Sequence, residues 1–316
     1  MRAYRLLAVC FAIAVGACSS QVGERGPEGT DPGTDPGTDP GTDPGTDPGT
    51  DPGTTAPLTC DTGASFFYLI NLVDVGKADA AGRVPGINLD GDVSDGRTQS
   101  GCRQADFTSP PPDDEDGVDN QLAVIARDIQ SSLDMSASLT SSINEGRFAV
   151  VAELSNVDDM TNDDCVYLEV GLGYLSDGTT APELGPDGRP VAGAMYDVRP
   201  LARVRGVIAD GRVYTDPTEI TSALTLVDPP VPVTIENAEV RFDVTAEKLD
   251  NGVIAGSMSI ASLLEMVSAT RPDMADFAEL VLRTNADLDP GAGGCQALSA
   301  GFVFEGVPAV KGAIRE

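Results

Sequence analysis

Two acidic stretches of the chain carry oxygen-bearing side chains at a spacing that suits a divalent cation. Each stretch places Asp or Asn near alternate positions and includes a glycine, which allows the chain to turn. The oxygen-bearing residues are Asn88, Asp90, Asp92 and Asp95 in the first stretch, and Asp114, Asp116 and Asp119 in the second. Calcium prefers such hard oxygen ligands, so the spacing predicts Ca²⁺ as a cofactor.

Neither stretch is an EF-hand, because the glycine is displaced and no glutamate stands at the twelfth position. The same clusters are also typical of solvated turns, since Asp and Asn tolerate turn geometry. Both interpretations remain open at this point.

The residue types that the chain lacks exclude several enzyme classes. There is no histidine, which rules out Ser-His-Asp and Cys-His catalysis and the usual zinc sites that contain histidine. The phosphate-binding Gly-rich loop that ends in Gly-Lys-Ser/Thr is also missing. Paired carboxylates could still support a hydrolase that acts on carbohydrate or envelope polymer, and this is the alternative function. The favoured interpretation is a protein that is not an enzyme.

The cysteines predict disulfide bonds. Cys10 lies in the apolar N-terminal segment, and Cys18 is discussed below. The remaining four are Cys60, Cys102, Cys165 and Cys295. An even number in an exported chain predicts two disulfides, for which three pairings are possible. A four-thiolate zinc site is the alternative, but the chain has no Cys-x-x-Cys pair to support it.

The N-terminus has the pattern of an export signal. Arg2 and Arg5 precede an apolar run from Leu6 to Val15, which is too short to span a bilayer. The residues Val15-Gly16-Ala17-Cys18 then resemble the lipobox of bacterial lipoproteins. The resemblance implies that residues 1–17 are a signal peptide removed by signal peptidase II and that Cys18 is acylated.

The residue after the acylated cysteine bears on the destination of such a lipoprotein. In lipoproteins of two-membrane bacteria, an Asp at this position implies retention in the inner membrane. Here the position is Ser19, so the resemblance implies a lipid anchor in the outer membrane. Two or three acyl chains are sufficient for stable anchoring.

A repetitive segment follows the predicted anchor. The tetrapeptide Thr-Asp-Pro-Gly occurs six times between Thr30 and Gly53. Residues 18–59 contain almost no bulky apolar side chains, so they cannot bury enough surface to offset the entropy lost on ordering. We therefore expect a disordered, acidic tether.

Residues 60–316 are expected to form a single β-rich domain with a long acidic loop over residues 76–120. They contain 42 acidic and 17 basic residues, a net charge of −25. Such a charge repels nucleic acid, so nucleic acid is not expected as a partner, and a cation or a basic partner is favoured.

The periodicity of this part predicts a mainly β fold. Apolar and polar residues alternate over many short runs, and turn residues separate these runs. Asp210-Gly211 and Asn251-Gly252 are typical two-residue hairpin turns. A helix is expected from Gln121 to about Leu133 with Asn120 as a cap, and two more before the last strand. The pattern predicts an antiparallel β-sandwich of jelly-roll type with a few short helices.

Together these features predict an anchored lipoprotein of the cell envelope. Its folded part would be an acidic binding or structural module, with a bound calcium ion and an unidentified protein or glycan ligand. The membrane is the second partner, through the N-terminal lipid. If the disulfides gather the acidic loops, these loops would meet at one end of the fold.

Overall fold

The computed structural model describes residues 60, 62–97, 100–130, 134–147, 149–224, 231–270, 272–291 and 294–315. The predicted signal peptide, the lipidation site Cys18 and the tether over residues 18–59 lie outside the described residues. Among the residues that are described, no helix is long and apolar enough to cross a membrane.

Strands make up about half of the described chain. The main sheet contains β1 (Ala64–Val75), β4 (Val150–Val157), β5 (Asp163–Leu175), β6 (Met195–Ala209), β7 (Arg212–Thr215), β8 (Thr218–Leu224), β9 (Val231–Thr245), β10 (Lys248–Ser259), β11 (Leu288–Gly291), β12 (Gly294–Pro308) and β13 (Val310–Ile314). Apart from β13, which runs parallel to β6, every pairing in this sheet is antiparallel. The predicted mainly β, antiparallel fold with a few short helices is confirmed.

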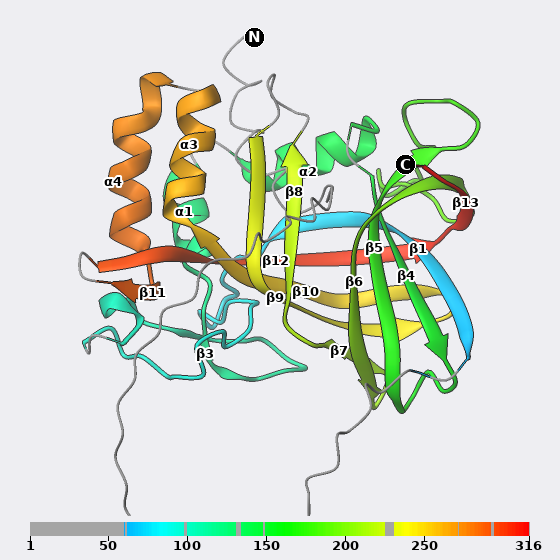
Figure 1. Cartoon of the computed structure of the whole chain (residues 1–316), viewed down its shortest axis with the longest axis horizontal. Coiled ribbons are helices and arrows are strands. Elements are labelled where there is room, and N and C mark those ends of the chain that lie inside the picture. Colours follow the sequence, from blue (N-terminus) through cyan, green and yellow to red (C-terminus); the bar gives the residue numbers. More distant parts are fainter. Residues whose placement is uncertain are drawn as a thin grey trace, which may run out of the picture. The chain divides into compact units, whose positions relative to one another are not determined.

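The sheet closes on itself (Figure 1). Within the described residues its order is β1-β4-β5-β6-β7-β9-β10-β12, and β1 pairs again with β12. Val73 of β1, for example, lies opposite Phe304 of β12. Hydrogen bonds therefore join these strands into one continuous ring. The sequence pattern did not predict this closure.

One of the two predicted hairpin turns is found. Asp210 and Gly211 both have positive φ, and they connect Ala209 to its partner Arg212 across the β6–β7 hairpin. Positive φ at both central residues is what a tight hairpin of this type requires.

The prediction of the other turn is wrong. Asn251 and Gly252 lie inside β10, and the β9–β10 turn occurs earlier, between the paired residues Thr245 and Lys248. Asn251 has a φ of 46°, and the strand register shifts there, as in a β-bulge. The reason lies in packing, since a Cβ atom at Gly252 would stand 2.6 Å from ring carbons of Phe304. Gly252 therefore provides room for an aromatic ring.

Four α-helices accompany the sheet in the described part of the chain. They are α1 (Gln121–Ile129), α2 (Met135–Asn144), α3 (Ile260–Thr270) and α4 (Ala275–Asn285). The predicted cap of the first helix is confirmed, because the Asn120 side chain accepts a hydrogen bond from the amide of Ala123. This helix ends at Ile129, and the predicted end at Leu133 falls outside the described residues.

The acidic segment over residues 76–120 contains only short elements. These are the 3₁₀ helix η4 (Ser100–Arg103) and the hairpin of β2 (Phe107–Thr108) with β3 (Asp116–Val118). An isolated bridge joins Ile87 to Asp119. A second 3₁₀ helix, η5 (Pro272–Met274), precedes α4. Backbone pairing therefore connects parts of the predicted irregular loop at several points.

Successive side chains of the ring strands face opposite sides, which produces apolar clusters on both sides of the sheet. Tyr68 and Ile70 belong to the large core, together with residues of the opposite strands. Leu69 lies between them in sequence and belongs to a smaller cluster with Val151, Tyr196 and Val198. This second cluster covers one outer face of the sheet, and we call it the outer-face cluster.

The four predicted disulfide cysteines form two pairs. Cys60 is bonded to Cys165 with a Cα–Cα distance of 5.0 Å, which joins a residue that precedes β1 to β5. Cys102 is bonded to Cys295 with a Cα–Cα distance of 5.8 Å, which joins η4 to β12. The fold thus selects one of the three pairings that the sequence left open.

Candidate functional site: a pocket on the outer face of the sheet

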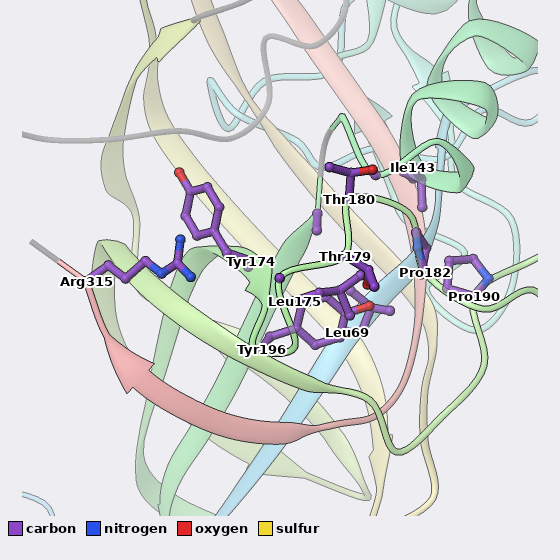
Figure 2. Close-up of a pocket in the computed structure, with 14 residues that line it drawn as sticks. Leu69, Ile143, Tyr174, Leu175, Thr179, Thr180, Pro182, Pro190, Tyr196 and Arg315 are labelled. Carbon is purple, nitrogen blue, oxygen red and sulfur yellow. The ribbon is translucent and has the colours of Figure 1, made fainter.

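A cavity of about 210 Å³ opens beside the outer-face cluster. We call it the outer-face pocket, and it is drawn in Figure 2. The residues that line it include Leu69, Ile143, Tyr174, Thr179, Thr180 and Tyr196. They come from β1, the end of α2, β5, the β5–β6 connection and β6, so the tertiary fold assembles the pocket from distant parts of the chain.

The β5–β6 connection forms one wall of the pocket because its sequence favours tight turns. Gly178, Gly188 and Gly193 all have positive φ, which glycine adopts without steric cost. The carboxylate of Asp177 accepts hydrogen bonds from the amide and the hydroxyl of Thr179. The same wall packs closely on the end of α2, where a Cβ atom at Gly146 would overlap the Thr180 carbonyl oxygen at 1.6 Å.

Tyr196 lies on the floor of the pocket, with its ring near Leu69 and Thr179 (Figure 2). Its side chain is 1% exposed. Gly173 on the neighbouring strand leaves room for the ring, since a Cβ atom there would stand 3.0 Å from a ring carbon. Within the described part of the chain, the Tyr196 hydroxyl has no hydrogen-bond partner. A buried polar group without a partner is uncommon and calls for an explanation.

The Tyr196 hydroxyl stays protonated over the physiological pH range. Burial raises its pKa to about 12, and the negative charge of Asp177 acts in the same direction. A neutral phenol can both donate and accept a hydrogen bond. An uncharged phenol is therefore buried beneath the floor of the pocket.

An ion pair lies at the mouth of the pocket. Nε and Nη2 of Arg315 donate to Oδ2 of Asp197 at 3.1 and 2.8 Å. The guanidinium group also lies 4.8 Å from the ring centre of Tyr174. Hydrogen bonds from the Ser176 hydroxyl and from Arg315 lower the pKa of Asp197. The cation at the mouth is thus already neutralised by a partner in the protein.

The two acidic stretches lie against each other, but the seven predicted calcium ligands have partners within the protein rather than a common centre. Asp90 accepts a hydrogen bond from the amide of Asp92, and Asn88 donates to the Asp92 carbonyl. Asp95 accepts from the amide of Arg97, Asp114 pairs with Arg83, and Asp116 accepts from the Thr108 hydroxyl. Over the described residues, no group of three or more acidic or cysteine side chains is arranged to hold a metal ion.

Asp119 is the one buried member of this set, at 1% exposure. It accepts a hydrogen bond from the amide of Leu89 at 2.7 Å. Burial raises its pKa to about 7, and the charges of Asp90, Asp287 and Asp106 act in the same direction. The expected convergence of the acidic loops on one cation is therefore not found among the described residues, and calcium binding stays a prediction.

Sequence reasoning missed every residue of the outer-face pocket. A signal was nevertheless present, because the segment from Asp177 to Pro190 is rich in glycine, proline and threonine between two strong strands. Its content of turn residues indicates a structured connection. Its contact with Tyr196 depends on the tertiary fold.

Searches of protein families, curated proteins and solved structures find no match to this chain.

Proposed function

We propose that this protein is a lipid-anchored binding module of the bacterial outer membrane, with the outer-face pocket as its ligand site. Cys18 would carry the lipid, and the Thr-Asp-Pro-Gly segment would act as a spacer between the membrane and the folded part. The observation that carries the binding role is the cavity of about 210 Å³ that lies between the β5–β6 connection, the end of α2 and the outer-face cluster.

The surroundings of the pocket support this proposal. Exposed large apolar side chains lie on the strands and turns that border it, and they include Tyr174, Leu184, Met195, Val310 and Ile314. Met195 pairs with Val310 across β6 and β13, and Leu184 pairs with Pro190, which lines the pocket. Exposed apolar groups gathered around a cavity are typical of ligand sites.

A fragment screen tests the ligand site without assuming a ligand. We would add a library of fluorinated fragments to the full chain in detergent micelles and follow binding by ¹⁹F NMR. A Thr180→Trp variant places a large ring at the pocket, and Thr161→Trp in the β4–β5 turn is the matched control. Fragments should bind the wild type and the control and should lose binding in Thr180→Trp. Equal binding to all three would refute the ligand site.

The anchor is tested separately by metabolic labelling with an alkyne analogue of palmitate. The wild-type chain should carry the label and fractionate with the outer membrane. Cys18→Ala should lose both properties, because the acylated thiol is missing. Cys10→Ala is the control, since this cysteine belongs to the segment removed on export. Retention of the label in Cys18→Ala would contradict the proposed anchor.

A further inference from the structure

A second cavity, of about 60 Å³, lies among the side chains of the large core, inside the closed sheet. Side chains from β1, β4, β5, β8, β9, β10 and β12 line it, and within the described residues all of them are apolar. We call this space the inner cavity, and we infer that it receives the end of an unbranched alkyl chain. The site is separate from the outer-face pocket and does not rest on the function proposed above.

Cross-strand pairs of apolar residues form the wall of the inner cavity. Residues that lie opposite each other on neighbouring strands share one face of the sheet. The pairs that line the cavity include Ile70 with Val150, Ala152 with Val170, and Val240 with Ile254. The closure of the sheet therefore brings apolar residues from distant strands around one space.

Part of this interior is filled and part is hollow. Along the inward face of β5, Val166 and Leu168 are 0% and 2% exposed. Val170 follows two positions later on the same face and is only partly buried, although it packs against the large core. Ile254 on β10 is also only partly buried and packs against the same core. Because both residues line the inner cavity, accessible apolar surface remains there for a guest to contact.

The lining and the size of the inner cavity restrict the guest. A buried water needs two to four polar partners, and the lining side chains provide none. A charged or hydrogen-bonding group would lose its hydration there without a replacement. An engineered apolar cavity that binds benzene measures about 150 Å³, so a space of about 60 Å³ is small for an aromatic ring. An alkyl chain is both apolar and narrow, and it satisfies both limits.

The ring offers an entrance where the strand pairing is interrupted. β6 pairs with β7 over Gly206–Ala209, and β8 pairs with β9. Within the described part of the chain, no strand pairing joins β6 to β8. Val170 on β5, the neighbour of β6, and Ile220 on β8 both line the cavity, so the cavity extends toward both sides of this break. An alkyl chain can therefore enter between β6 and β8 without the loss of a strand pairing.

NMR titration of the full chain with the substitution Cys18→Ala tests the inference, since this variant carries no acyl group and needs no detergent. The probes are the 1-alkanols from propanol to octanol, and benzyl alcohol is the ring-shaped comparison. Labelled isoleucine methyl groups report where the probes bind. The lining isoleucines are Ile70, Ile220 and Ile254, and the reference isoleucines outside the cavity are Ile87 and Ile314. The signals of the lining isoleucines should move, and those of the reference isoleucines should not.

The length of the alkanol provides a quantitative signature. Each buried methylene should strengthen binding by about fourfold, and this gain should stop within the series, once the cavity is full. Benzyl alcohol should bind more weakly than hexanol. A gain that continues to octanol, tighter binding of benzyl alcohol, or equal shifts at lining and reference isoleucines would overturn the inference.

Two variants of the cavity wall complete the test. Ala152→Val adds two carbon atoms and should weaken hexanol binding by about 10- to 20-fold, the equivalent of two excluded methylenes. Ala313→Val is the matched control, because it makes the same change at an exposed position of β13, and it should bind like the wild type. Ile254→Ala removes three carbon atoms from the wall and should bind benzyl alcohol more tightly than the wild type does, which decides the matter if Ala152→Val does not fold. Wild-type binding of hexanol in Ala152→Val, or no gain for benzyl alcohol in Ile254→Ala, would refute the alkyl site.

Discussion

Tyr68 and Tyr196 are equally buried, at 1% exposure each, but only the hydroxyl of Tyr68 has a partner in the described structure. It donates to the carbonyl oxygen of Thr245 at 2.8 Å. The Tyr196 hydroxyl is left without such a bond. The two residues lie on opposite faces of the closed sheet, one in the large core and the other in the outer-face cluster. The contrast separates a tyrosine whose hydroxyl bonds within the fold from one whose hydroxyl has no partner in the described structure.

This contrast predicts opposite effects of the same substitution on stability. Tyr68→Phe removes the buried hydrogen bond to the Thr245 carbonyl, which should lower the free energy of unfolding by about 1–2 kcal/mol. Tyr196→Phe removes a group that has no protein partner, so stability should be unchanged or should rise by up to about 1 kcal/mol. Urea unfolding of both variants measures the difference. An equal loss in both would show that Tyr196 has a structural partner.

The buried carboxyl group of Asp287 predicts a decline of stability with rising pH. Asp287 is 2% exposed, and its carboxylate accepts hydrogen bonds from the amide and the hydroxyl of Ser299. Burial raises its pKa to about 7 from the usual 3.8, although the bonds from Ser299 oppose the shift. Between these two values the folded chain holds a proton that the unfolded chain has lost. This group's contribution is therefore fully present below pH 4 and is lost by about pH 7, by up to about 4 kcal/mol.

The substitution Asp287→Asn tests this pH dependence, because an amide does not titrate but can still bond to Ser299. Urea midpoints at pH 5 and pH 8 should differ less in the variant than in the wild type. Asp276→Asn is the control, since this residue is exposed on α4, and it should behave like the wild type. A wild-type slope preserved in Asp287→Asn would contradict the assignment.

A buried ion pair connects the acidic segment to the sheet. Arg212 is 6% exposed on its side chain and pairs with Asp113 at 2.8 Å and with Asp243 at 2.7 Å. Its replacement would leave the Asp113 carboxylate buried and unpaired. We expect Arg212→Met to lower the free energy of unfolding by about 3–5 kcal/mol.

The matched control for Arg212→Met is Arg283→Met. Arg283 pairs with Glu279 on α4, but both side chains are about half exposed. Such surface pairs contribute roughly 0.3–0.5 kcal/mol, so the control should unfold almost as the wild type does. Thermal unfolding of the two variants would show the difference, and similar midpoints would exclude a structural role for the Arg212 pair.

The disulfide pairing can be checked directly by peptide mapping without reduction. Cys60 should be recovered with Cys165, and Cys102 with Cys295. The second bond spans 193 positions of the sequence, and replacing both of its cysteines with alanine should cost about 2–5 kcal/mol. Any other pairing in the oxidised, folded protein would contradict the described arrangement of η4 and β12.

Short-range signals predicted the parts of the fold that depend on local conformation. Asn120 was recognisable as a helix cap, and Asp210-Gly211 was recognisable as a hairpin turn, because each acts through its own backbone. Asn251-Gly252 carries the same local signal but forms a bulge. Its environment includes Phe304, which is distant in sequence, so the turn signal alone could not distinguish the two outcomes.

The candidate site shows the same division between what local sequence signals predict and what contacts between distant residues decide. The sequence by itself determined the strand-rich class of the fold, the four cysteines available for pairing and the acidic turns, since composition and periodicity are properties of neighbouring residues. Only the tertiary structure decided that the sheet closes through β1 and β12, which cysteines pair, and that Tyr196 lies beside Leu69 and Thr179. Those relationships depend on contacts between residues far apart in the chain. The local sequence pattern around each residue does not specify these long-range contacts.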